Sequence, residues 1–255
     1  MSDVIFSKDN KIYKYLKSLL QKKYRQREKL FLVEGEVVIR ESLNYKIPKI
    51  IAISEEYKEK FEDIILNFNG NVYFFSKELF KNLISTENSQ GIIGYFENLH
   101  LDIKNLTLGR YIFLDNLQDP GNVGGIIRSL DGFGLDGIIL SKNTVELYNP
   151  KLIRSTMASI FRTRIYICDD EDILRLKNTF ILIATDVNGA EESYNYKFPE
   201  NFILILGNEA NGVSKKLLNV AHKKIYIPIE GINSLNVNVA GSILMYEIKR
   251  NDCSR

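Results

Sequence analysis

The sequence contains few of the residues on which metal centres and covalent catalysis depend. Of its 255 residues, only two are cysteine and two are histidine. Cys168 and Cys253 are far apart in the chain, and His100 and His222 stand singly. This pattern excludes a disulfide scaffold and a zinc cluster, and it offers no HExxH, CxxC or Ser–His–Asp arrangement. We therefore expect a chain that needs no metal and that works in a reducing compartment such as the cytoplasm.

Long apolar runs and nucleotide-binding loops are also absent. No charge-free apolar segment is long enough to span a bilayer, and the first residues lack the pattern of a signal peptide, so we expect neither a membrane span nor export. Neither GxGxxG nor GxxxxGK[ST] occurs, which argues against a dinucleotide-binding unit and a P-loop ATPase. The chain is 45% hydrophobic and 26% charged, as is usual for soluble globular proteins.

Basic residues are concentrated between Lys8 and Lys29. Apolar residues in this region, from Ile12 to Leu20, recur at helical spacing, so the sequence predicts an amphipathic helix that exposes lysines on one face. Such a cluster offers positive charge to a phosphate backbone, although an ordinary solvated helix face has the same composition. Its densest part consists of Lys22, Lys23, Arg25 and Arg27.

Apolar strands alternate with helices in two successive regions, which predicts two α/β domains with a parallel sheet in the second. In the first region we expect strands at 30–35, 50–53, 72–75 and 91–97, and helices at 36–43, 55–68 and 76–84. In the second we expect strands at 111–115, 137–140, 164–167, 180–184, 202–206 and 224–228, and helices at 123–133, 150–160, 170–177, 214–219 and 236–250. The predicted domains are residues 1–97 and 110–255, with a linker at 98–109.

Three stretches at the ends of predicted strands are rich in glycine and asparagine. They are "DPGNVGGIIR" from Asp119, "LGNEANGVS" from Leu206 and "EGINSLNVNVAG" from Glu230. Each alone is compatible with an ordinary turn or helix cap. Ligands of open parallel sheets bind beyond the carboxyl ends of the strands, so the three together indicate a ligand site. We interpret the first as a bare loop that lets chain and substrate approach closely.

These stretches resemble the signature of the SpoU/TrmH branch of the SPOUT methyltransferases. The matching pieces are "LDNLQDPGNVGGIIRSLDGFG", "LILGNEANGVS" and "IPIEGINSLNVNVAGSILMYE", and the N-terminal "RQREKLFLVEGEVVIRESL" and "TENSQGIIGYFE" resemble the substrate-binding domain often fused to that branch. The resemblance implies methyl transfer from S-adenosylmethionine to a ribose 2′-hydroxyl of RNA. It also implies an L30e-like RNA-binding N-terminal domain, a C-terminal SPOUT domain with a deep trefoil knot, and a homodimer. Ala210 and Ala158 stand where the family usually has glycine.

The resemblance assigns roles to individual residues. Arg128 would act on the 2′-hydroxyl, either as its base or by stabilising the developing alkoxide, because arginine is almost always charged. Four further residues would complete the catalytic group, namely Asn122, Glu209, Ser234 and Asn236. The adenosyl part of the donor would be held, largely by backbone groups, at Leu206, Gly207, Ile227, Ile229, Ser234 and Leu235. RNA would bind the basic cluster of Lys22, Lys23, Arg25 and Arg27.

Other functions remain open on the sequence alone. The separate N-terminal domain favours ribosomal RNA, in particular 23S RNA, as the substrate, with transfer RNA as the alternative. A catalytically silent RNA-binding protein of the same fold is a second possibility, and a small-molecule α/β enzyme is a third. Retention of all five proposed catalytic residues argues for the enzyme, because a binding module has no need of them.

Overall fold

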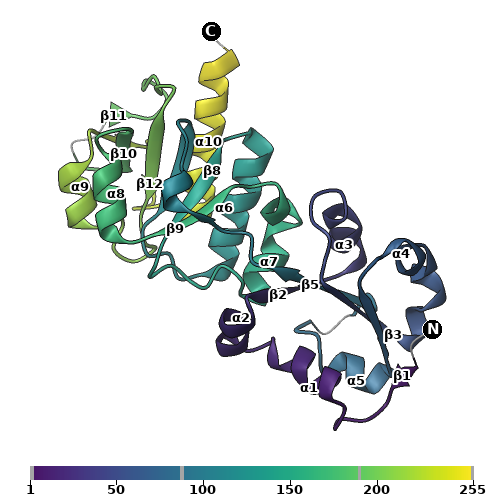
Figure 1. Cartoon of the computed structure of the whole chain (residues 1–255). Coiled ribbons are helices and arrows are strands. Elements are labelled where there is room, and N and C mark those ends of the chain that lie inside the picture. Colours follow the sequence, from purple (N-terminus) through teal and green to yellow (C-terminus); the bar gives the residue numbers. More distant parts are fainter. Residues whose placement is uncertain (1–2, 87–88, 189–190, 254–255) are drawn as a thin grey trace. The chain divides into compact units, whose positions relative to one another are not determined.

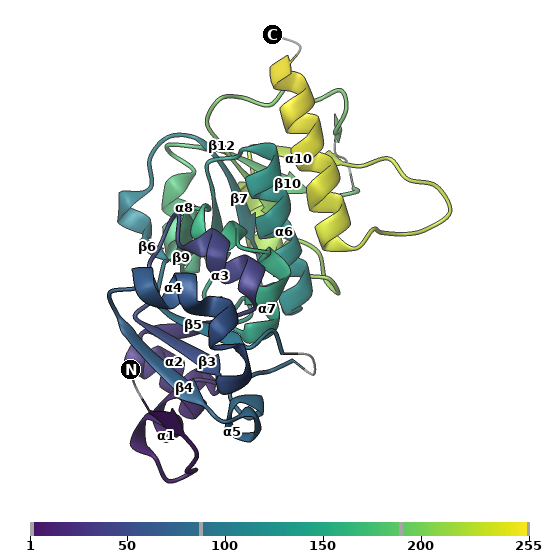
Figure 2. The same ribbon diagram turned by 90° about the vertical axis from the view of Figure 1, so that its right-hand side faces the viewer.

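The computed structural model describes residues 3–86, 89–188 and 191–253 (Figures 1 and 2). Within it the chain forms two compact units. The first comprises Met1–Leu99 together with Tyr148–Phe161, and the second comprises His100–Leu147 and Arg162–Arg255. The predicted first domain ended at residue 97 and did not include residues 148–161.

The first unit is built on a five-stranded mixed sheet with strand order β1-β4-β3-β5-β2. Strand β5 is antiparallel to both of its neighbours, whereas β1, β4 and β3 are parallel to one another. The strands are β1 (Val4–Ile5), β2 (Leu30–Glu34), β3 (Ile50–Ser54), β4 (Asn71–Phe75) and β5 (Ile92–Glu97). The helices are α1 (Lys11–Ser18), α2 (Lys22–Glu28), α3 (Glu36–Ser42), α4 (Glu62–Asn67), α5 (Lys77–Lys81) and α7 (Pro150–Thr156), with 3₁₀ turns η1 (Glu55–Tyr57), η2 (Glu59–Phe61) and η4 (Ser159–Phe161).

Aromatic stacking explains why residues 148–161 belong to the first unit. Successive residues of a strand point to opposite faces of a sheet, so Leu32 packs in a core cluster with residues of α1 and α5 while Phe31 points the other way. The Phe31 ring stacks on Tyr148 with 4.6 Å between centroids, and Phe96 lies 4.8 Å from Phe161. Strand alternation therefore creates an apolar face that a distant segment of the sequence helps to cover.

Met157 and Ala158 end α7 in the left-handed region, at φ 47° and 70°. Glycine accepts this conformation without strain, which accounts for the usual glycine at position 158 in the resembling family. Ala210, the other departure, does not have a positive φ. In the segment "TENSQ", Glu87 and Asn88 lie outside the described residues.

The second unit contains an eight-stranded sheet in which every pairing is parallel, as predicted, with order β11-β13-β10-β12-β7-β8-β9-β6. Its strands are β6 (Leu101–Asp102), β7 (Arg110–Leu114), β8 (Gly137–Ser141), β9 (Ile165–Cys168), β10 (Ile181–Thr185), β11 (Glu191–Glu192), β12 (Phe202–Leu206) and β13 (Lys223–Tyr226). Its helices are α6 (Pro120–Phe133), α8 (Asp170–Leu176), α9 (Lys215–Val220) and α10 (Val237–Cys253), with the 3₁₀ turn η3 (Ile103–Asn105). Part of the predicted linker thus forms an edge strand, because β6 pairs with β9.

Helices cover both faces of this sheet. One face packs Phe113, Ile205 and their neighbours against α8 and α9. On the other face α6 and α10 lie side by side in both views (Figures 1 and 2). Gly241 of α10 faces the sheet: a Cβ added there would come within 2.8 Å of Leu206 Cδ1. This packing brings the start of α10 and the start of α6 to the carboxyl ends of β7 and β12.

Candidate active site

The loops that follow β7 and β12 are tied together by buried polar groups. Asp115 is only 3% exposed, and its carboxylate accepts a 2.7 Å hydrogen bond from the Ser214 backbone N–H. The Asn208 side chain donates to the Asn116 carbonyl at 2.8 Å. A buried carboxylate needs such partners. None of these residues was predicted to take part in the site, although an aspartate directly after an apolar strand is a signal that could have identified Asp115.

Helix α6 begins earlier than predicted, so "DPGNVGG" is not a bare loop. The helix starts at Pro120, with Asp119 as the N-cap whose side chain accepts a 2.9 Å hydrogen bond from the Asn122 N–H. Aspartate at the N-cap followed by proline at the first helical position is a strong start signal. The glycines therefore lie in the first turns of a helix, and the interpretation as a loop was wrong.

Two glycines of the motifs permit close packing within the protein. A Cβ on Gly125 would come within 2.5 Å of the Asn238 amide on α10, and a Cβ on Gly207 would come within 2.0 Å of the backbone of Gly212 and Val213. The loop after β12 is closed by reciprocal backbone hydrogen bonds of 2.9 and 2.8 Å between Asn208 and Gly212. Glycine at position 207 is thus required by the way this loop folds back on its strand.

A chain of hydrogen bonds connects the three motifs. The Asn122 side chain donates to Glu209 Oε1 at 3.0 Å, and the Asn236 side chain donates to Asn122 Oδ1 at 3.0 Å. The backbone N–H groups of Gln118 and Asp119 lie 3.5 Å from the Glu209 carboxylate. The structure therefore brings together Asn122, Glu209 and Asn236, each from a different motif.

The environment of Glu209 favours its ionised form. Partial burial raises the pKa of this carboxyl, but the hydrogen bonds from Asn122 and from the backbone N–H groups outweigh it, so the pKa lies below its ordinary value. Hydrogen bonds to the charged form are the cause of the net shift. Glu209 is thus an anchor that accepts hydrogen bonds at neutral pH.

Asn236 has a second role as the cap of α10. Its Oδ1 accepts from the Asn238 N–H at 2.9 Å and from the Val239 N–H at 3.4 Å, while its amide nitrogen reaches Asn122. The helix-cap interpretation is therefore confirmed for this residue, and its amide also contacts the residue from the first motif. Ser234 precedes the helix and is exposed.

The structure does not join Arg128 to this hydrogen-bonded group. Arg128 is exposed on α6 and forms no hydrogen bond or ion pair with any residue that the structure describes. It follows Asn122 by six residues, which in a helix of 3.6 residues per turn places it about a third of a turn away around the axis. No residue of the described ranges therefore neutralises its charge.

The backbone groups at which the resemblance places the donor have few partners within the protein. The backbone N–H and C=O groups of Gly207, Ile227 and Leu235 make no backbone hydrogen bond within the described residues outside the regular elements, and Gly207 is buried. Buried backbone groups require partners. Leu206 is buried and Ile229 is half-buried, so apolar surface adjoins these groups. An adenine ring needs this combination of apolar contact and a few polar groups.

The basic cluster of the first unit is only partly at the surface. Lys22, Lys23 and Arg27 are exposed. Arg25 is only 4% exposed, and its guanidinium donates to the carbonyls of Leu19 and Leu20 at 3.0 and 2.7 Å. Because these carbonyls follow the last turn of α1, Arg25 satisfies groups that a helix end leaves without partners. The expectation that Arg25 binds RNA is therefore corrected.

Within residues 3–86, 89–188 and 191–253, no helix is long and apolar enough to cross a membrane. No group of three or more histidine, cysteine, aspartate or glutamate residues in those ranges is arranged to hold a metal ion.

Comparison with known proteins agrees with this geometry. Residues 109–246 match the model of the SpoU rRNA Methylase family, and residues 10–94 match that of the MRM3-like substrate binding domain. The chain is 32% identical over 255 residues to the 23S rRNA (guanosine(2553)-2′-O)-methyltransferase RlmP of Bacillus subtilis (strain 168), covering 98% of this chain and all of that protein.

Solved structures extend the likeness to the whole fold. An AdoMet-bound rRNA methyltransferase from Sinorhizobium meliloti superposes with a TM-score of 0.88 at 27% identity, covering 97% of each chain. The SpoU methyltransferase AviRb from Streptomyces viridochromogenes has a TM-score of 0.87 at 21% identity, covering 96% of this chain and 98% of that one, and supports the fold alone. The chain belongs to the SpoU rRNA methylase family and is an S-adenosylmethionine-dependent RNA 2′-O-methyltransferase.

Proposed function

We propose that this chain methylates a ribose 2′-hydroxyl of 23S ribosomal RNA in the cytoplasm. The observation that carries the proposal is the hydrogen-bonded group of Glu209, Asn122 and Asn236, which fixes three loops at one edge of the parallel sheet. The full-length likeness to RlmP, whose name states 23S rRNA 2′-O-methylation, supports the substrate class. The first unit would bind the RNA and the second would bind the donor and carry out the transfer.

Residues of the second unit would have separate roles in the methyl transfer. S-adenosylmethionine supplies an electrophilic methyl group when bound, held by the backbone at Gly207, Ile227 and Leu235. The ribose 2′-oxygen is the nucleophile: its bond to the methyl carbon would form as the methyl–sulfur bond of the donor breaks, so S-adenosylhomocysteine leaves and the hydroxyl proton passes to water. Arg128 is exposed and has no partner among the described residues, so its cationic guanidinium is available to stabilise the developing alkoxide. Ser234, also exposed, would donate a hydrogen bond to the RNA or the donor.

Single-turnover methyl transfer with saturating RNA and donor tests the role of Arg128. Arg128→Ala should slow transfer by about 100-fold or more, the usual cost of removing one group that stabilises charge in a transition state. Calorimetric affinity for the donor should stay within about twofold, because a transition-state interaction is lost. Arg175→Ala is the matched control, since this exposed arginine pairs with Glu171 and Asp172 of its own helix, α8. Near wild-type transfer by Arg128→Ala would make Arg128 an ordinary surface residue.

We infer that the enzyme is a two-fold homodimer and that its second unit contains a deep trefoil knot. Family resemblance supports both features. Helix α10 supports the dimer further, because Val239 and Tyr246 are 46% and 54% exposed on it, and exposed apolar side chains mark contact surfaces. Light scattering at micromolar concentration should give twice the 29.4 kDa chain mass. A monomer mass would contradict the dimer.

A further inference from the structure

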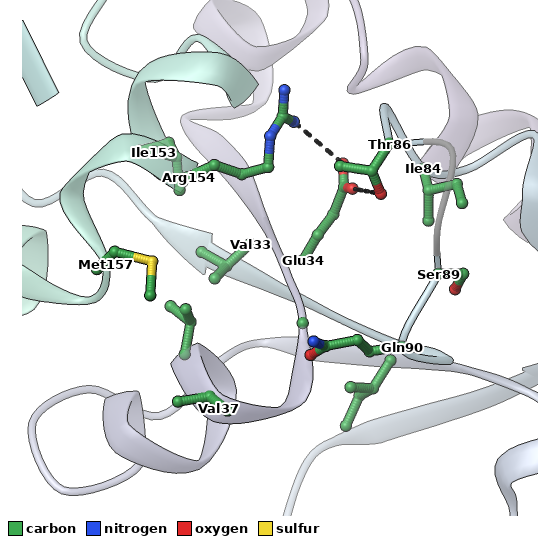
Figure 3. Close-up of a pocket in the computed structure, with 13 residues that line it drawn as sticks. Val33, Glu34, Val37, Ile84, Thr86, Ser89, Gln90, Ile153, Arg154 and Met157 are labelled. Atoms are coloured by element: carbon green, nitrogen blue, oxygen red, sulfur yellow. Dashed lines mark hydrogen bonds and ion pairs between the residues drawn. The ribbon is translucent and has the colours of Figure 1, made fainter. Parts of the chain in front are cut away.

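We propose that a cavity in the first unit binds an unpaired nucleobase of the RNA substrate (Figure 3). This inference rests on the proposed function, since it assumes that the substrate is RNA. The cavity has a volume of about 270 Å³ and is lined by residues of β2, α3, the segment before β5, and α7. All of the lining residues belong to the first unit. Its site is separate from the basic cluster of Lys22, Lys23 and Arg27.

One side of the cavity is apolar and open to solvent. Val37 and Met157 are 63% and 47% exposed, and the close-up shows Val33 to the right of Met157 and above Val37 (Figure 3). Met157 is held there in the left-handed conformation that ends α7. Exposed apolar side chains that gather around a cavity indicate a ligand with a flat or apolar surface. The face of a nucleobase fits this description, because unpaired bases stack on apolar side chains.

The other side presents a fixed amide. Gln90 Oε1 accepts a 2.7 Å hydrogen bond from the Glu36 N–H, which sets the orientation of the side chain. Its Nε2 makes no hydrogen bond with the described residues. Gly35, at φ 104°, lets the amide lie close, since a Cβ there would stand 3.0 Å from Gln90 Oε1. The Gln90 amide is therefore fixed in orientation, and its Nε2 can donate a hydrogen bond to an acceptor atom on the edge of a base.

The charged side chains at the rim of the cavity are compatible with the negative charge of a nucleotide. The Glu34 side chain is 7% exposed and accepts hydrogen bonds from Ser85 Oγ at 2.6 Å and Thr86 Oγ1 at 3.0 Å. Arg154 lies 3.9 Å from this carboxylate and also bonds Ser85. The carboxylate is therefore neutralised within the protein. The Arg154 side chain is 34% exposed, and its remaining N–H donors suit the phosphate beside the bound base.

The choice of RNA as the occupant has independent support. Residues 10–94, which supply most of the cavity wall, match the model of a substrate binding domain. Specific recognition of RNA depends mainly on unpaired bases in loops and bulges, because side chains cannot read the deep groove of an RNA duplex. A cavity with an apolar face, a fixed amide and a cation at its rim meets these requirements.

The test measures how two variants bind an unmodified 23S rRNA transcript over a range of salt concentrations. Val37→Ser removes an apolar contact with the base and Gln90→Ala removes the amide, so each should weaken RNA binding about tenfold, the usual worth of one bound base. The salt dependence should stay unchanged, because Arg154 and its phosphate contact are retained in both variants. Leu66→Ser is the matched control, since Leu66 is a 76% exposed apolar residue of α4 outside the cavity.

The outcomes separate this inference from the proposed function. Unchanged RNA affinity in both variants, with wild-type urea midpoints and wild-type methyl transfer, would overturn the cavity proposal and leave the methyltransferase intact. A second outcome is that both variants bind RNA more weakly but the wild-type chain transfers no methyl group. This result would support the cavity proposal and overturn the enzymatic function. If only binding to intact ribosomal particles were weakened, and not binding to naked RNA, the occupant would be a protein and the proposal would be wrong.

Discussion

At the scale of single residues, the glycines of the motifs differ sharply in what they permit. A Cβ on Gly207 would collide with the backbone of Gly212 and Val213, which cannot move aside as a side chain can. Gly207→Ala should therefore destabilise the second unit by about 1–3 kcal/mol and weaken donor binding measured by calorimetry. Gly132, on α6, has no atom within 4 Å of an added Cβ. Gly132→Ala should leave stability unchanged or raise it by up to about 1 kcal/mol, and equal effects of the two changes would contradict this account.

The contribution of Glu209 to the stability of the folded protein should depend on pH. Hydrogen bonds hold its pKa in the folded protein below the ordinary value of 4.5. The stability it contributes is therefore fully present above pH 4.5 and is lost as the pH falls through the lower folded value. Glu209→Gln should cost roughly 1 kcal/mol in urea unfolding at pH 7, and the difference from wild type should shrink below pH 4.5. A difference that grows with acidity would rule out a charged anchor.

At the scale of elements, the contact between α6 and α10 depends on one close approach. A methyl group at Gly125 would press on the Asn238 amide, whose Oδ1 is already buried without a hydrogen-bond partner within the described residues. Gly125→Ala should cost about 1–2 kcal/mol of unfolding free energy. In an Asn238→Ala background the same change should cost nothing or stabilise the helix. A double-mutant cycle with no coupling between the two positions would show that this contact is unimportant.

The basic residues of α2 have two different roles, one in stability and one in RNA binding. Arg25 satisfies the carbonyls that follow α1, so Arg25→Ala should lower the unfolding free energy by about 2–3 kcal/mol without a specific effect on the salt dependence of RNA binding. Changing Lys22, Lys23 and Arg27 together to alanine should leave stability within about 0.5 kcal/mol. It should also flatten the salt dependence of RNA binding by up to about one phosphate contact per residue. Unfolding by urea and binding over a salt series separate the two effects.

At the scale of the whole molecule, periodicity and composition predicted most elements and the parallel sheet of the second unit, because apolar strands and helix caps are local signals. The start of α6 was predicted too late in the chain. The glycines of "DPGNVGG" were interpreted as a loop, although Asp119 and Pro120 are a helix-start signal. The three motifs were identified at strand ends, and Asn122, Glu209 and Asn236 do meet.

Contacts between distant parts of the chain were not predictable in the same way. The stacking of Phe31 on Tyr148 joins residues more than a hundred positions apart, so no local pattern placed α7 in the first unit. In the sequence, Arg25 cannot be distinguished from the exposed basic residues beside it. Its burial becomes visible only from the path of the chain between α1 and α2. The cavity beside Gln90 depends on the first of these contacts, because residues of α7 line one of its sides.

The position of the transferred methyl group tests the central claim most directly. The chain is incubated with an unmodified 23S rRNA transcript and isotopically labelled S-adenosylmethionine, and the RNA is digested to nucleosides for mass spectrometry. We predict label in a single 2′-O-methylnucleoside with the wild-type chain, and an initial rate of labelling lower by about 100-fold or more with Arg128→Ala. Label on a base, or no label although RNA and donor both bind, would contradict the assignment of this site to ribose 2′-O-methylation.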